Sequence, residues 1–206
     1  MKKTKKFIYL ISPKKILSYE FYENLEKIFK TNKVSYFQLR LKKTTKKNII
    51  KIAKKIKKLT RKYNVKLIIN DDPSLSIKIN ADGCHIGQKD FNLKKARKIL
   101  KNKILGITCH NSIKLARTAI KNKADYLAFG SFYQSKTKKV KYNANIKIIH
   151  LTKKITNIPI VAIGHVKNMV DTTYIDKFLE YISAELGDAI VFQTLSEAYN
   201  KWLESR

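Results

Sequence analysis

The sequence predicts a (β/α)8 barrel, of the α/β class, that occupies residues 1–206 as a single domain. The chain of 206 residues is 44% hydrophobic, which is enough to bury a sizeable core. Short runs rich in β-branched residues alternate with longer stretches of helical period. No linker-like segment interrupts this alternation, so we expect one domain.

Eight runs are expected to form the strands. They are Phe7–Ser12, Tyr36–Leu41, Val65–Asn70, Gly83–Gly87, Ile104–Cys109, Tyr126–Phe132, Ile158–Gly164 and Asp188–Gln193. Most of these runs are apolar at consecutive positions, which is typical of strands buried on both faces of a parallel sheet.

The stretches between the strands are expected to form helices. They are Tyr19–Thr31, Lys47–Tyr63, the short Pro73–Asn80, Leu93–Lys101, Ser112–Lys123, Ile146–Ile155, Asn168–Leu186 and Ser196–Leu203. In the second of them, Ile49, Ala53 and Ile56 fall on one side and lysines on the other, which indicates a helix that covers a sheet. Right-handed crossovers wind such units in one direction, and eight of them close a barrel. An open doubly wound sheet is the alternative.

The charge is strongly positive. Lys and Arg number 45 against 15 Asp and Glu, for a formal net charge of +30. Few of the cations are arginine, whereas bidentate phosphate contacts and base recognition favour the guanidinium group. We therefore expect a solvated lysine surface that attracts anionic small molecules and binds nucleic acid only weakly and non-specifically.

Two further features bear on the cellular environment. Cys84 and Cys109 are too few for a disulfide framework and lack metal-ligand spacing, so we expect small buried side chains. No apolar run approaches the ~20 residues that span a bilayer, and Phe7–Ile11 is too short for a signal-peptide core. A cytoplasmic protein without a membrane partner is expected, and the sequence does not indicate its oligomeric state.

Polar residues gather where the predicted strands end, which is where parallel barrels and open sheets place their chemistry. Gln38, Arg40 and Lys42 alternate along the second strand, so they are expected to point inward together. Two buried cations side by side require an anion. The third strand ends in Asn70–Asp72 and the fourth runs into His85–Asp90, so carboxylates lie beside that cation pair. This donor set suits a magnesium ion that bridges to a phosphate or pyrophosphate.

The next two strands continue the pattern. The fifth ends in Thr108–Asn111, and the sixth leads to a loop, Gln134–Lys139, whose hydroxyls and lysines suit oxyanions. Taken together, these segments resemble the thiamine phosphate synthase family, in order and in register from about residue 7 to residue 164. The matching segments are Phe37–Lys42 (QLRxK in the family), Ile68–Asp71 (IND), Ala81–Asp90 (ADGVHLGQxD), Gly106–His110, Ala124–Gly130 (ADYVxFG), Ser135–Lys138 (TxTK) and Val161–Gly164.

The resemblance implies a (β/α)8 transferase of thiamine biosynthesis. It joins hydroxymethylpyrimidine pyrophosphate to hydroxyethylthiazole phosphate, releases pyrophosphate and forms thiamine phosphate. The reaction is dissociative, so the barrier falls mainly through stabilisation of charge on the leaving pyrophosphate. The thiazole nitrogen carries a free lone pair, and attack needs no general base.

The resemblance also implies roles for individual residues. Asp71 and Asp90 would hold magnesium. Around the pyrophosphate oxygens it places Arg40, Lys42, Asn70 and Lys138, and the pyrimidine would contact Gln38, His85 and Thr108. Near the thiazole phosphate it places Ser135, Thr137 and Gly164. The residues expected to be catalytic are Arg40, Lys42, Lys138 and Thr108.

The sequence departs from the family pattern at several positions. Asp72 stands where Arg is usual, Gln134 replaces a Pro, and His165 replaces the second Gly of a phosphate-binding turn. The last strand, Ala189–Leu195, lacks the family's serine- or glycine-bearing phosphate motif. We expect an intact metal–pyrophosphate half and an altered thiazole-phosphate half. The alternatives are a thiazole tautomerase that uses His110, and a catalytically silent barrel whose surface binds RNA or another polyanion.

Overall fold

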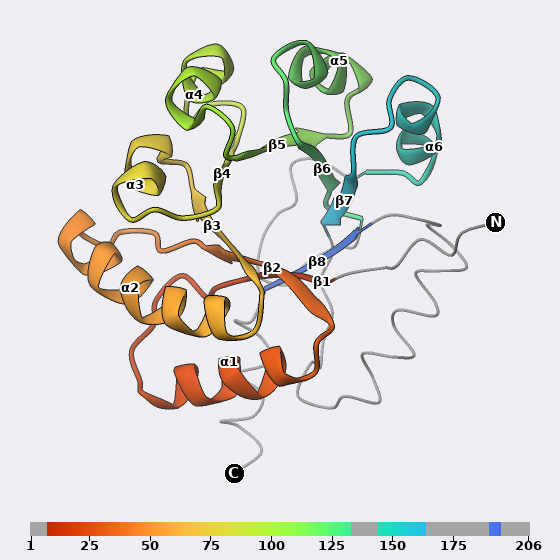
Figure 1. The fold of residues 1–206 in the computed structure, drawn as a ribbon. Coiled ribbons are helices and arrows are strands. Elements are labelled where there is room, and N and C mark those ends of the chain that lie inside the picture. Colours follow the sequence, from red (N-terminus) through yellow and green to blue (C-terminus); the bar gives the residue numbers. More distant parts are fainter. Residues whose placement is uncertain (1–7, 133–143, 164–189, 195–206) are drawn as a thin grey trace.

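The computed structural model describes residues 8–132, 144–163 and 190–194 (Figure 1). Eight parallel strands form a closed barrel in sequence order, so the predicted (β/α)8 class is confirmed. The strands are β1 (Ile8–Ile11), β2 (Val34–Leu39), β3 (Lys66–Asn70), β4 (Gly83–Ile86), β5 (Ile104–His110), β6 (Tyr126–Gly130), β7 (Ile160–Ile163) and β8 (Ile190–Thr194). The described helices are α1 (Glu20–Lys30), α2 (Lys46–Lys62), α3 (Pro73–Lys78), α4 (Leu93–Leu100), α5 (Ile113–Lys121) and α6 (Lys147–Lys153).

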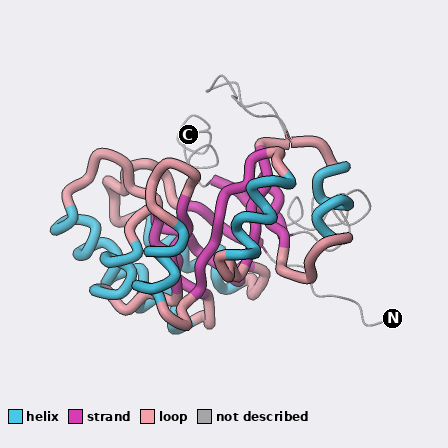
Figure 2. Tube along the Cα trace, turned by 90° about the horizontal axis from the view of Figure 1, so that it is seen from above, coloured by secondary structure: helices cyan, strands magenta, loops and turns pink. Residues whose placement is uncertain are grey.

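The helices lie outside the strands. They form an arc around the sheet in Figure 1, and the view from above shows strands at the centre with helices beyond them (Figure 2). β8 closes the barrel because it pairs with β1 and with β7, where Ile8 faces Val191 and Val161 faces Ile190. The helices expected over 168–186 and 196–203 lie outside the described residues.

The strands are buried on both faces, and each face contributes side chains to a different part of the core. Side chains such as Tyr9, Ile68 and Tyr126 fill the barrel interior. Neighbours on the opposite face, such as Leu10 and Leu127, pack between the strands and the helices. This double burial explains the consecutive apolar positions in the strand sequences.

The described elements agree with the predicted ranges to within two residues at each end, and the difference at β2 matters for the site. β2 ends at Leu39 rather than Leu41. The Ser12 N–H donates to the Gln38 carbonyl, and then the Arg40 N–H donates to Ser12 Oγ at 2.8 Å, so a side chain takes over where the ladder would continue. Both Arg40 and Lys42 follow the strand; Lys42 is exposed and Arg40 is partly buried, so the structure does not show the expected pair of buried cations.

Four helices begin at a side chain that accepts a backbone N–H of the first turn. These N-cap residues are Thr45, Asp72, Asn92 and Ser112. Such caps satisfy donors that have no partner within the helix, typically for about 1 kcal/mol each. They hold the loops that follow the strands against the helix starts.

The same set of hydrogen bonds between an aspartate and a leucine backbone occurs twice at the amino ends of the strands. Asp82 Oδ2 accepts the Leu67 N–H at 2.8 Å, and Asp125 Oδ2 accepts the Leu105 N–H at 2.7 Å. In each case the Asp backbone N–H also donates to the carbonyl of the same leucine. Arg97 adds an ion pair to Asp125 at 2.5 Å. Each aspartate therefore ties the start of one odd-numbered strand to the start of the next strand.

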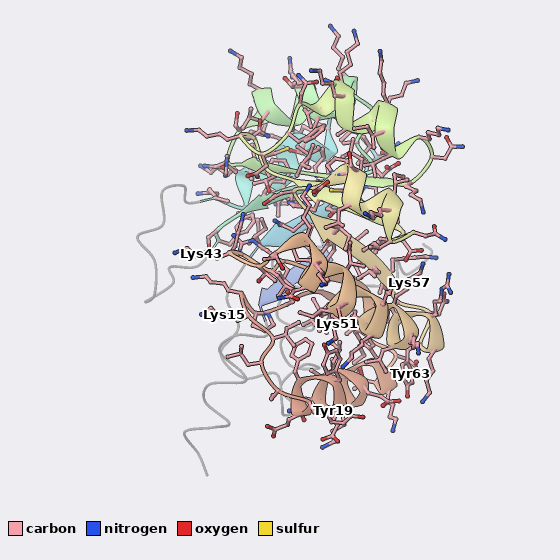
Figure 3. The ribbon with its side chains drawn as sticks, turned by 90° about the vertical axis from the view of Figure 1, so that its left-hand side faces the viewer. Lys15, Tyr19, Lys43, Lys51, Lys57 and Tyr63 are labelled. Carbon is pink, nitrogen blue, oxygen red and sulfur yellow. The ribbon has the colours of Figure 1, made fainter. Side chains whose placement is uncertain are left out.

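The outer surface is rich in lysine. The five helices α2 to α6 contain no Asp or Glu, whereas α1 contains Glu20, Glu23 and Glu26. Side chains with nitrogen tips project away from the ribbon in Figure 3, and Lys51 of α2 is exposed. Lys15 and Lys43, from the loops after β1 and β2, lie on the same side of that view.

The expectations about the two cysteines and about membrane spans can be compared with the structure. Cys84 and Cys109 are free and buried, as predicted. Over the part of the chain that the structure describes, no helix has the length and apolar character needed to cross a membrane.

Candidate active site

The predicted site residues that the structure describes lie at or just beyond the carboxyl ends of β2 to β5, where a parallel barrel presents its loops. Strand register brings Asn70 of β3 beside His85 of β4. Asn70 and Arg40 are partly buried there. The site is therefore assembled from neighbouring strand ends rather than from one contiguous segment.

Two carboxylates face one another at this end. Asp71 follows β3 with a backbone φ of 64°, and its N–H donates to the His85 carbonyl at 2.8 Å. Partial burial, followed by the charge and the hydrogen bond of Asp71, raises the pKa of Asp90 above its usual range. Lys42 Nζ lies 2.7 Å from Asp71 Oδ2. Two adjacent carboxylates with one lysine are a site that a further cation stabilises.

Gly87 explains how Asp90 reaches this position. The Gly87 N–H donates to Asp90 Oδ2 at 3.0 Å, so the carboxylate folds back over the loop. A Cβ on residue 87 would lie 2.3 Å from that oxygen. A side chain at residue 87 would displace the Asp90 carboxylate from this position.

The carboxylate pair fits magnesium. Its ligands are hard oxygen donors, and magnesium is commonly bound by one or two carboxylates plus water and substrate phosphate oxygens. Within the described residues, no group of three or more His, Cys, Asp and Glu could hold a metal ion. An ion at Asp71 and Asp90 would therefore take its remaining ligands from outside this set, as a pyrophosphate complex provides.

A chain of side-chain hydrogen bonds crosses the barrel interior beneath the carboxylates. Gln38 Nε2 donates to the Tyr9 hydroxyl at 3.1 Å, and the Tyr9 and Tyr126 hydroxyls are 2.7 Å apart. His85 Nδ1 lies 2.8 Å from the Tyr126 hydroxyl, and His85 Nε2 lies 2.8 Å from Thr108 Oγ1. The chain joins β2, β1, β6, β4 and β5.

The members of this chain are uncharged at neutral pH. Burial raises the pKa of Tyr9 and of Tyr126, and it lowers the pKa of His85 to about 4. The Arg40 charge also lowers the His85 pKa, while Asp71 opposes that shift. His85 is therefore a neutral hydrogen-bonding group and carries one ring proton.

Sequence reasoning selected Gln38, His85 and Thr108 but missed Tyr9 and Tyr126, which link them. A usable signal was present, because both tyrosines occupy inward-facing positions of predicted strands, where a hydroxyl requires a partner. Gly106 was a second signal. A Cβ at residue 106 would lie 1.8 Å from Cζ of Tyr126, so the glycine makes room for that ring.

Asp72 has a structural role. Its Oδ1 accepts the Leu75 N–H at 2.8 Å as the N-cap of α3, and its Oδ2 lies 2.9 Å from Lys46 Nζ. Burial opposes ionisation, but Lys46 and the backbone hydrogen bonds hold the Asp72 pKa below its usual value. This acid is thus turned toward α3 and α2, although it follows Asp71 in the sequence.

The structure brings together the described members of the predicted site. They are Gln38, Arg40, Lys42, Asn70, Asp71, His85, Asp90 and Thr108. The remaining predicted residues lie outside the described residues. They are Ser135, Thr137, Lys138 and Gly164, together with the divergent positions Gln134 and His165.

Comparison with known proteins tests the resemblance. A family model described as thiamine monophosphate synthase matches residues 8–172. The chain belongs to the thiamine monophosphate synthase family. The predicted family, function and transferase class are thereby confirmed.

Individual members of the family show how far the similarity extends. The thiamine-phosphate synthase of Pelagibacter ubique (strain HTCC1062) is 61% identical over 163 residues, which are 79% of each chain. That of Clostridium acetobutylicum is 36% identical over 182 residues, or 87% of this chain and 85% of the relative. Among solved structures, the thiamine phosphate pyrophosphorylase from Pyrococcus furiosus aligns with a TM-score of 0.74 at 20% identity and covers 98% of both chains. That structure supports the fold.

Proposed function

We propose that this protein catalyses magnesium-dependent coupling of hydroxymethylpyrimidine pyrophosphate to hydroxyethylthiazole phosphate, giving thiamine phosphate and pyrophosphate. The observation that carries the proposal is the facing pair Asp71 and Asp90 beside Lys42, in a chain that belongs to the synthase family. We also propose that residues 1–206 form one domain that works in the cytoplasm on small-molecule substrates.

Magnesium at Asp71 and Asp90 would supply positive charge to the pyrophosphate oxygens as the bond to the pyrimidine methylene breaks. Arg40, Lys42 and Asn70 would bind the same leaving group and keep it oriented. Stabilising charge that grows in the transition state lowers the barrier, and loss of one such contact typically costs about 10²–10³ in rate.

The buried chain supports a pyrimidine site. We propose that Gln38, His85 and Thr108 contact the ring, because they offer neutral donors and acceptors below the carboxylates. A neutral His85 also suits this place, since an imidazolium would repel the carbocation left by departing pyrophosphate.

The acceptor half of the site is proposed from the resemblance alone. Lys138 would contact pyrophosphate, and Ser135, Thr137 and Gly164 would lie at the thiazole phosphate. His165, beside Gly164, gives a direct test. We expect His165→Gly to lower the KM for thiazole phosphate if the histidine obstructs the phosphate, whereas a raised KM would mean that His165 binds it.

The deciding experiment is product analysis. Purified protein is incubated with magnesium and both substrates, and thiamine phosphate and pyrophosphate are quantified over time. Equal amounts of both products are expected, together with loss of both on chelation of the metal. Pyrophosphate alone would mean that ionisation occurs without coupling. If neither product forms, the proposal is overturned, and the tautomerase or the silent barrel is favoured.

A further inference from the structure

One hydroxyl group joins the ends of β1 and β2, next to the proposed pyrophosphate site. Ser12 follows β1 and Arg40 follows β2, and the Ser12 N–H donates to the Gln38 carbonyl as a ladder bond would. If the ladder continued, the Arg40 N–H would donate to the Ser12 backbone carbonyl. It donates instead to Ser12 Oγ at 2.8 Å. A side-chain atom therefore accepts the Arg40 N–H at the point where β2 leaves the sheet.

The hydrogen-bonding directions at this hydroxyl follow from its partners. A backbone N–H can only donate and a carbonyl can only accept, so Ser12 Oγ accepts from Arg40 and donates to the Pro13 carbonyl at 3.1 Å. Pro13 itself has no N–H to offer to a ladder. The hydroxyl thus bridges the residues that follow β1 and β2.

Arg40 is the residue whose position this bridge determines. Its charge lowers the pKa of His85 in β4, so the guanidinium acts at the mouth of the barrel, two strands away from its own backbone. Arg40 is partly buried, whereas Ser12 is only 3% exposed. A ligand is therefore expected to reach Arg40 and not the Ser12 hydroxyl.

We propose that Ser12 is a positioning residue that holds Arg40 at the pyrophosphate through this backbone hydrogen bond. The proposal rests on the function proposed above, in which Arg40 binds the leaving group. An arginine meets phosphate oxygens through a planar fork of N–H groups, so its contact depends on the place and direction from which the side chain starts. Small displacements of such a group are costly to binding and rate.

Removal of the hydroxyl is expected to move Arg40. In Ser12→Ala, the Arg40 N–H must bind water or take the ladder position on the residue 12 carbonyl, and the Pro13 carbonyl loses a donor. Either change shifts the Arg40 backbone relative to β1. Ser12→Thr retains the hydroxyl and is the conservative variant.

Ser76→Ala is the matched control. Ser76 is also buried, and its Oγ donates to the Gly83 carbonyl at 2.7 Å, where it ties α3 to β4. This variant loses one buried serine hydroxyl that binds the backbone, as Ser12→Ala does, but the lost bond joins elements other than β1 and β2.

The measurement is the dissociation constant of magnesium pyrophosphate, obtained by calorimetry with the full chain and without turnover. We expect Ser12→Ala to weaken binding about 10-fold, and Ser12→Thr and Ser76→Ala to change it less than about 3-fold. Wild-type affinity in Ser12→Ala overturns the proposal, and so does an equal loss in Ser76→Ala.

A double-mutant cycle with Arg40→Gln separates positioning from a general loss of structure. If Ser12 acts through Arg40, Ser12→Ala has no further effect on pyrophosphate affinity once residue 40 is changed. A further 10-fold loss in the Arg40→Gln background overturns the proposal.

Ser12→Cys covers the case in which Ser12→Ala does not fold. The thiol is a weaker acceptor than the hydroxyl, so affinity should fall, and wild-type affinity in Ser12→Cys overturns the proposal. Product formation by the wild type, with unchanged affinity in the Ser12 variants, overturns the role of Ser12 alone. A wild type that neither turns over nor binds magnesium pyrophosphate overturns the proposed function and the role of Ser12 together.

Discussion

The two ends of the barrel use the same residue types in opposite ways. At the amino ends of the strands, Asp82 and Asp125 each accept a backbone N–H, and Arg97 neutralises Asp125. At the carboxyl ends, Asp71 and Asp90 face one another, so part of their charge is left for a ligand. The comparison teaches that the presence of an aspartate does not show whether it is structural or functional. The group that its carboxylate contacts distinguishes the two.

The largest expected effect tests the functional end. Asp71→Asn keeps the shape of the side chain and a residue type that tolerates positive φ, but it removes a ligand charge. We expect turnover to fall by about 10²–10³ while the melting temperature stays unchanged or rises, because a repulsion between carboxylates disappears.

The control is Asp82→Asn at the opposite end, which should keep its turnover. Turnover assays and thermal melts of both variants check this pair. Equal losses of activity in the two variants would contradict the distinction between the ends.

A second effect concerns pH and His85. Its pKa in the folded protein is about 4, below the ordinary value of 6.5. As pH falls below 6.5, the unfolded chain binds a proton that the folded protein does not, so stability decreases until pH reaches about 4. The loss over this window is about 3 kcal/mol.

Denaturant titrations between pH 7 and pH 4 measure this slope. His85→Gln should flatten it, because the variant lacks the group whose pKa falls on folding. Parallel slopes in the wild type and His85→Gln would refute the assignment.

A third effect tests the structural end. Asp125→Ala leaves the Leu105 N–H and Arg97 without their carboxylate, and we expect a loss of about 1–3 kcal/mol in unfolding free energy. The kcat of the folded fraction should be unchanged. A fall in kcat without a fall in stability would place Asp125 among the functional residues.

The smallest effect is expected at Asp82, which makes the same backbone hydrogen bonds as Asp125 but has a longer ion pair. Lys66 Nζ lies 3.9 Å from Asp82, whereas Arg97 lies 2.5 Å from Asp125. Asp82→Ala should therefore lower the melting temperature less than Asp125→Ala does. The reverse order in a side-by-side thermal melt would show that the ion pair does not distinguish the two copies.

Most of the fold could be predicted from the sequence, because hydrophobic period reports burial directly. Alternating strands and amphipathic stretches predicted the barrel, and the Asn70–Asp71 and Asp90 pattern predicted its acidic edge. The end of β2 could not be predicted, since it depends on Ser12, which lies in another loop and takes the Arg40 N–H. Local pattern does not contain that contact.

The polar chain was equally hidden, for a related reason. Tyr9 and Tyr126 are 117 positions apart, and each looks like an ordinary aromatic core residue in its own strand. Their hydroxyl contact arises only when β1 and β6 face one another across the closed barrel. The need for glycine at residue 106 also arises from a residue distant in sequence, because the Tyr126 ring of the neighbouring strand occupies the space of a side chain.

The duplicated aspartate device has a consequence for the order in which the chain folds. Each copy closes a short stretch of chain, since Asp82 binds Leu67 and Asp125 binds Leu105 within the same β–α–β unit. Closing such short loops costs less entropy than joining β1 to β8, which lie near opposite ends of the chain. Local contacts of this kind form early. The two units are therefore expected to acquire protection from amide hydrogen exchange before the barrel is sealed.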